Sequence, residues 1–85
     1  MEKNKKTIKM DILEKFRELE EEAGSILPND WLQHDYFDRL TTYEKQVFQQ
    51  AAAELASIGL VEYDPGIFPE LKLTQKGEYL LFYGK

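Results

Sequence analysis

The feature that most constrains this fold is a change of hydrophobic period at Gly59. Apolar residues before Gly59 recur at helical spacing, whereas those after it alternate with polar residues. Side chains on one helix face recur about every 3.6 residues, and those on one strand face recur every second residue. The sequence therefore predicts an α+β chain in which a helix passes directly into strands.

The segment before the change, residues 42–58, has clear signals at both ends. Thr41 and Glu44 have the spacing of a capping box, in which each side chain bonds the backbone amide of the other residue. Gly59 is suited to a left-handed stop, with Leu60 as its apolar contact. The buried face is expected to contain Val47, Phe48, Ala51, Ala52, Leu55 and Ile58.

The segments after the change, residues 60–63 and 71–73, are predicted to form an antiparallel hairpin. Asp64, Pro65 and Gly66 provide a turn signal between them, because proline suits the first central turn position and glycine accepts positive φ. One register puts the apolar residues on one face and an opposite-charge pair on the other. Its pairs are Val61 with Leu73, Glu62 with Lys72, and Tyr63 with Leu71.

Three further segments complete the prediction before the capping box. A helix over residues 7–23 is expected to start at Thr7 and to stop at Gly24. Residues 25–28 are expected to be briefly extended, since a residue that precedes proline avoids the helical region. Asn29 is then expected to cap a helix that reaches residue 40 and places Leu32, Tyr36 and Leu40 on one face.

The last predicted helix covers residues 75–83 and starts at Thr74. Gly77 lies inside it, where glycine often marks close backbone packing. Residues 79–83 make the end of this helix apolar nearly all round, and we expect it to dock on the first helix. Any part that does not dock would be an exposed apolar patch that invites a partner.

Length and charge predict one acidic domain. The chain has 85 residues and a net charge of −5, and a chain of this length suits a single domain. Four lysines and one glutamate give residues 1–9 a charge of +3, whereas seven cations and fifteen carboxylates give the remainder −8. We expect a flexible basic segment over residues 1–6 and a single domain over 7–85. Glu18, Glu20, Glu21 and Glu22 are either a solvated helix face or an acidic patch for a basic partner.

Two stretches of the chain carry a family resemblance. Residues 54–61, ELASIGLV, look like the exit from a recognition helix into a wing, and residues 71–80, LKLTQKGEYL, are similar to the leucine-threonine-x-lysine-glycine segment that closes many bacterial winged helices. With the order of elements, they make the chain resemble the winged helix-turn-helix superfamily. The resemblance implies three helices, a two-stranded wing and a short terminal helix.

The resemblance also implies that helix 42–58 would lie in a DNA major groove. Glutamine can read adenine, but the predicted wing offers Asp64 and Glu70 where a phosphate contact needs cations. The candidate nucleic-acid contacts are Arg39, Lys45, Gln46, Gln49, Gln50, Lys72 and Lys76.

The competing hypothesis is contact with a protein partner or a second copy of the chain. Apolar and aromatic residues at the wing tip and in the last helix either fold back onto the body or enter an interface, where aromatic residues are enriched. The candidate interaction surface contains Tyr43, Ile67, Phe68, Leu81, Phe82 and Tyr83.

Other functions find little support in the residues. There is no cysteine, no glycine-rich phosphate loop and a single histidine, His34. Asp30, His34 and Asp38 have a spacing that puts them on one helix face, but a lone histidine makes a poor metal site. We expect no catalysis, cofactor, small-molecule substrate or membrane span, and a cytoplasmic location. A protein-interaction module is the first hypothesis, and a DNA-binding regulator is the alternative.

Overall fold

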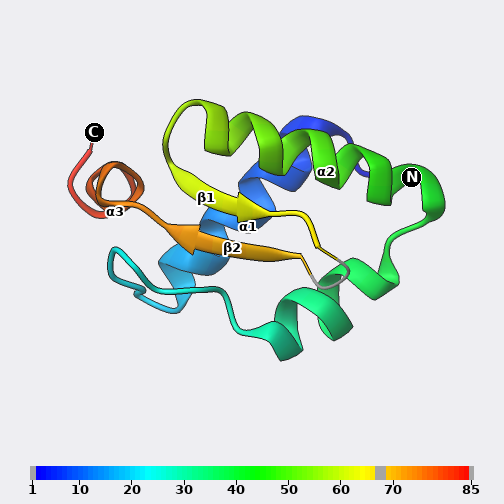
Figure 1. Ribbon diagram of the computed structural model, residues 1–85, viewed down its shortest axis with the longest axis horizontal. Helices are drawn as coiled ribbons and strands as arrows, with labels where there is room; N and C mark the ends of the chain where they lie inside the picture. Colours follow the sequence, from blue (N-terminus) through cyan, green and yellow to red (C-terminus); the bar gives the residue numbers. More distant parts are fainter. Residues whose placement is uncertain (1, 67–68, 85) are drawn as a thin grey trace.

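The computed structural model describes residues 2–66 and 69–84, and it is an α+β arrangement around a two-stranded hairpin. In Figure 1, α1 (Lys5–Glu18) passes behind the hairpin and α2 (Thr42–Ser57) lies along one side of it. The short helical segments η1 (Asp30–Tyr36) and η2 (Phe37–Arg39) lie on the other side. Strands β1 (Val61–Asp64) and β2 (Glu70–Leu73) lead into α3 (Gln75–Phe82), at one end of the long axis.

Helix α1 begins and ends earlier than the sequence predicted. The Asn4 side chain accepts a 2.8 Å hydrogen bond from the Thr7 amide, so Asn4 and not Thr7 is the N-cap. At the other end Glu20 has a φ of 53°. Its amide donates to the Arg17 carbonyl, and the next amide donates to the Phe16 carbonyl. This Schellman arrangement stops the helix before Gly24 is reached.

Gly24 instead joins the chain to the hairpin. With a φ of 94°, it donates its amide to the Leu73 carbonyl at 2.7 Å. The next residues are extended as predicted: Ile26 forms an antiparallel bridge with Lys72, and the Leu27 amide donates to the Leu71 carbonyl at 3.0 Å. Residues 24–27 therefore cover the outer edge of β2.

The helix predicted after Asn29 has a different form. Asn29 is itself helical and makes no side-chain cap; η1 is a π-helix and η2 a 3₁₀-helix. Leu32, Tyr36 and Leu40 are nevertheless buried as expected. The change of helical period coincides with the packing of two adjacent rings, Tyr36 and Phe37, on Phe48 at centroid distances of 6.2 and 5.3 Å. The apolar spacing thus predicted which side chains are buried here but not the type of helix.

Helix α2 follows the prediction closely. The Glu44 amide donates to the Thr41 hydroxyl at 3.1 Å, and the Thr41 amide donates to the Glu44 carboxylate at 2.9 Å, which completes the capping box. Gly59 has a φ of 83°, and the Leu60 amide donates to the Leu55 carbonyl. The predicted buried face is correct except for Ile58, which is 52% exposed because it lies in the C-terminal cap.

The hairpin has the predicted register, with Val61 opposite Leu73, Glu62 opposite Lys72 and Tyr63 opposite Leu71. The Thr74 hydroxyl then accepts the Gly77 amide at 3.0 Å and starts α3 as predicted. Gly77 packs directly against the start of the hairpin, since an added Cβ would lie 2.2 Å from the Leu60 carbonyl oxygen. This contact fixes the N-terminal turn of α3.

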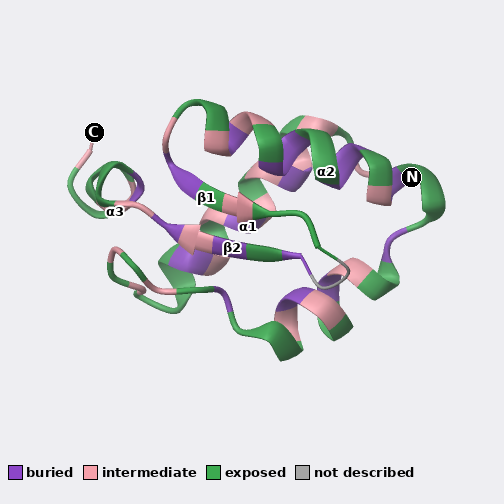
Figure 2. Cartoon of the chain, in the orientation of Figure 1, coloured by how far each residue is buried: buried purple, intermediate pink, exposed green. Residues whose placement is uncertain are grey.

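The hydrophobic core joins α1, α2, the hairpin and residues 27–40 in one cluster. Its largest fully buried side chains are Phe16, Phe48, Ile8, Ile12, Leu27, Leu32, Leu55, Leu71, Leu73 and Val61. Figure 2 shows that α3 contributes little to this cluster, because most of its length is exposed. The expected docking of α3 on α1 is therefore only partial.

Candidate interaction surfaces

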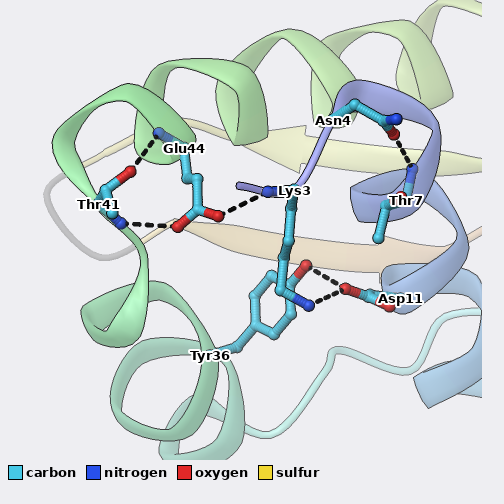
Figure 3. A network of polar contacts seen from close by, with 7 residues as sticks. All are labelled: Lys3, Asn4, Thr7, Asp11, Tyr36, Thr41 and Glu44. Atoms are coloured by element: carbon cyan, nitrogen blue, oxygen red, sulfur yellow. Dashed lines mark hydrogen bonds and ion pairs between the residues drawn. The ribbon is translucent and has the colours of Figure 1, made fainter. Parts of the chain in front are cut away.

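The basic N-terminal residues contact the body of the protein. Figure 3 shows Lys3 between the start of α2 and Tyr36: its backbone N–H donates to Glu44 Oε2 at 2.7 Å, and its Nζ lies 2.8 Å from Asp11 Oδ2. The Tyr36 hydroxyl donates to the same Asp11 oxygen at 2.7 Å. Within the segment expected to be flexible, Lys3 thus joins η1, α1 and α2.

This network changes the acidity of two of its members. The backbone N–H groups of Lys3 and Thr41 donate to the Glu44 carboxylate and lower its pKa. Burial raises the pKa of the Tyr36 hydroxyl, as does its hydrogen bond to Asp11. At neutral pH the carboxylate is therefore charged and the phenol neutral, which is the protonation state that the hydrogen bonds require.

Two further lysines, Lys5 and Lys9, pair with the other carboxylate of α2, that of Glu54. Lys5 Nζ lies 2.5 Å from Glu54 Oε2, and Lys9 contacts the other oxygen of the same carboxylate. These two lysines lower the pKa of Glu54. The Glu54 side chain is therefore directed to α1. Both acidic side chains of α2 are consequently engaged in contacts with the N-terminal segment.

The solvent face of α2 is therefore rich in uncharged polar groups. The predicted candidates Gln46, Gln49 and Gln50 are all exposed there. Lys45, in the first turn, is half-buried with its Nζ 5.3 Å from the centroid of the Phe37 ring. This face brings three amide side chains and one cation together on a single helix.

The other candidate cations do not extend this face into a continuous basic strip. Arg39 is exposed just before α2, at the end of η2. Lys72 lies 4.0 Å from Glu62 across the hairpin, and Lys76 donates to the Ile58 carbonyl at 2.8 Å. Lys76 of α3 lies beside the C-terminal end of α2, whereas Lys45 lies in the first turn of α2. The length of α2, roughly 20 Å, therefore separates the two cations.

The predicted protein-interaction residues do not form one surface. Tyr43 is 58% exposed in the first turn of α2, at the end of the long axis opposite to α3 (Figure 1). Leu81 is half-buried against the core, whereas Phe82 and Tyr83 are exposed. Ile67 and Phe68 lie outside the described residues. The predicted residues that remain together are thus those at the end of α3.

Helix α3 exposes more apolar surface than the candidate set included. Tyr79 and Leu80 are 65% and 47% exposed, and Tyr83 is 69% exposed. The Tyr79 and Tyr83 rings lie 6.1 Å apart, one helical turn from each other. We call Tyr79, Leu80, Phe82 and Tyr83 the α3 patch. The all-round apolar pattern of residues 79–83 was the signal for Tyr79 and Leu80.

A cleft of about 460 Å³ lies where the α3 patch meets the end of α1. Phe82 and Tyr83 form its apolar part. Its charged lining residues are Arg17, Glu20, Glu21, Glu22 and Glu78. Glu78 was missed from the sequence, because only the fold brings it beside residues 20–22.

A second groove, of about 400 Å³, lies beside Trp31 and Tyr36, whose rings are stacked with centroids 5.1 Å apart. Lys15 Nζ lies 5.1 Å from the Trp31 centroid, and the Lys3 ammonium lies over Tyr36. Both lysines also pair with carboxylates of α1. Both cations of this groove are therefore already paired within the chain.

Among residues 2–66 and 69–84, no group of three His, Cys, Asp or Glu side chains is placed to hold a metal ion. His34 Nδ1 lies 3.5 Å from Asp38 Oδ2, and the pair is exposed. In the same residues, every helix is too short or too polar to cross a membrane. No protein-family model, curated protein or solved structure matches the chain.

Proposed function

We propose that this chain is a non-catalytic winged-helix module that binds a protein through α3. The single observation that carries the proposal is the α3 patch, whose large apolar side chains face solvent although the chain has an ordered core beside them. A contiguous group of aromatic residues at the molecular surface is typical of a contact site. The order of the elements, which is α1, the short helical segments η1 and η2, α2, the hairpin and α3, agrees with the winged-helix resemblance.

Site-specific photo-crosslinking in the native cell tests this function. A photoreactive amino acid replaces Tyr79 in one variant, and Gln49 on the solvent face of α2 in a matched control. The proposal expects protein adducts from position 79 and none of the same size from position 49. Absence of protein adducts at position 79, with the variant folded, would overturn it. Sedimentation over a range of concentrations then shows whether the crosslinked partner is a second copy of this chain.

A second candidate function is DNA binding through α2. One observation favours it: Glu44 and Glu54 are drawn away from the solvent face of α2, which leaves Gln46, Gln49 and Gln50 exposed there. Amide side chains can form two hydrogen bonds with adenine. Because the two carboxylates are engaged elsewhere in the chain, they repel DNA phosphates less. Duplex DNA binding at low salt should then weaken with added salt and with Lys45→Ala. No binding at low salt would discard this candidate.

A further inference from the structure

We propose that the partner of the α3 patch is a basic, amphipathic polypeptide segment that enters the cleft between α1 and α3. This inference rests on the proposed function and adds the chemistry of the partner. The cleft combines apolar rings with carboxylates, so its occupant must supply both apolar side chains and positive charge.

The apolar half of the argument comes from Phe82 and Tyr83. Both line the cleft, and Tyr79 continues the surface along α3. Leucine-like side chains would bury these rings, and the stem of a lysine or arginine could lie along them with its charge at the rim. A cation over an aromatic face is also attracted by the ring itself.

The acidic half comes from four glutamates, Glu78 and the run at residues 20–22. Arg17 is the one cation that lines the cleft among the described residues, and its guanidinium bonds Glu14 at 3.2 Å. Within residues 2–66 and 69–84, no cation lies within ion-pair distance of the four glutamates. The negative charge of the cleft is therefore available to a partner.

The backbone holds this acidic run in place. The left-handed Glu20 turns the chain away from the axis of α1, and the Gly24 amide ties the following turn to the Leu73 carbonyl of β2. Because Thr74, the cap of α3, comes directly after Leu73, both walls of the cleft are attached to the same strand end.

Charge complementarity favours a basic partner over a second copy. A two-fold dimer presents the same face to itself, so the four glutamates of each copy would be brought close to those of the other. The whole chain carries a net charge of −5, which adds to this repulsion. A basic segment gains attraction from the same groups and associates faster at low salt.

Fluorescence anisotropy with two short labelled peptides tests the inference on the full chain. One peptide is an amphipathic helix of leucine and lysine, and the other has glutamate in place of lysine. We expect the lysine peptide to bind at least about tenfold more tightly, with an affinity that falls as salt is added. Equal binding of the two peptides would overturn the inference.

Two matched pairs of variants locate the binding. The triple variant Glu20→Gln, Glu21→Gln, Glu22→Gln should weaken lysine-peptide binding roughly five- to tenfold. The control triple Asp30→Asn, Asp35→Asn, Glu70→Gln makes the same change of net charge elsewhere on the exposed surface and should have little effect. Tyr83→Ala should weaken binding, whereas Tyr43→Ala should not. Equal effects within either pair would overturn the inference.

The outcomes separate this inference from the proposed function. If crosslinks form at position 79 but the lysine peptide fails to bind, α3 is a contact site and its partner is not basic. If sedimentation shows a dimer that Tyr83→Ala disrupts, the occupant is a second copy, and the inference is wrong. If position 79 yields no adduct, the proposed function itself fails.

Discussion

Helices α2 and α3 are each capped by a threonine whose hydroxyl accepts a hydrogen bond from the amide three residues later, but their apolar side chains lie in different environments. In α2, Val47, Phe48 and Leu55 are buried in the core. In α3 only the backbone at Gly77 is buried, and Tyr79 and Tyr83 face solvent. The apolar side chains of α2 thus form part of the core, whereas those at the end of α3 remain at the surface. Substitutions in both helices test this difference.

Phe48→Ala should have the largest effect on stability. The ring is fully buried and contacts Tyr36, Phe37 and Tyr63, so it joins η1, η2, α2 and β1. Its removal leaves a cavity in the centre of the core, and the free energy of unfolding should fall by about 3–5 kcal/mol. Urea denaturation monitored by circular dichroism measures the change. Tyr43→Ala on the same helix is the control, and a loss of less than about 1 kcal/mol at Phe48 would contradict the assigned role.

Gly77→Ala should destabilise the protein although alanine is the better helix former. An added Cβ would lie 2.2 Å from the Leu60 carbonyl oxygen and 2.7 Å from a Leu73 methyl group. The clash should outweigh the gain of about 1 kcal/mol in helix propensity and give a net loss of about 1–3 kcal/mol. Gln75→Ala, at an exposed position of the same helix, is the control. A more stable Gly77→Ala protein would show that α3 is not held by this contact.

The elements of the fold differ in how well the sequence predicts them. The capping box, the stop at Gly59 and the register of the hairpin were predicted correctly, because each depends on residues close in sequence or on one alternating pattern. Glu20 was missed as the end of α1, since the nearby Gly24 is the stronger local signal for a left-handed turn. The π-helical form of η1 was also missed, and the packing of its Tyr36 on Phe48 of α2 is a tertiary contact that no local pattern reveals.

The candidate sites were harder to predict than the elements. Gln46, Gln49 and Gln50 are exposed on α2, and helical spacing alone is enough to group them on one face. The ion pairs of Glu54 with Lys5 and Lys9 were not predicted. Glu54 lies 49 positions after Lys5 and 45 positions after Lys9, so helical spacing within α2 does not indicate these contacts. The acidic cleft likewise requires Glu78 and residues 20–22 to meet through the fold.

The contact between Lys3 and Glu44 predicts an acid-sensitive start of α2. The pKa of Glu44 is lower in the folded chain than its ordinary value of 4.5. Above that value both folded and unfolded chains are ionised, and the stabilisation is complete. As the pH falls below about 4.5, the unfolded chain takes up the proton first, so stability is lost until the folded pKa is passed.

Glu44→Gln should therefore make stability less dependent on pH below about 4.5, with an effect smaller than that of Gly77→Ala. Denaturation midpoints at a series of pH values between neutrality and strong acid measure it. Glu70→Gln, in an exposed position of β2, is the control and should leave the profile unchanged. An identical acid profile for Glu44→Gln and the unaltered chain would show that the Lys3 contact does not form in solution.

The smallest expected change in stability comes from the α3 patch, where the double substitution Tyr79→Ser and Tyr83→Ser removes two large rings. Because both rings are mostly exposed, the loss of each should alter the free energy of unfolding by no more than about 0.5 kcal/mol. The same variant should lose the crosslinked partner and the lysine peptide. Binding lost at unchanged stability would distinguish α3 sharply from α2, where removal of one ring at Phe48 should threaten the fold itself. A loss of about 2 kcal/mol or more in the double variant would instead mean that these tyrosines pack within the chain, and α3 would then be a structural helix like α2.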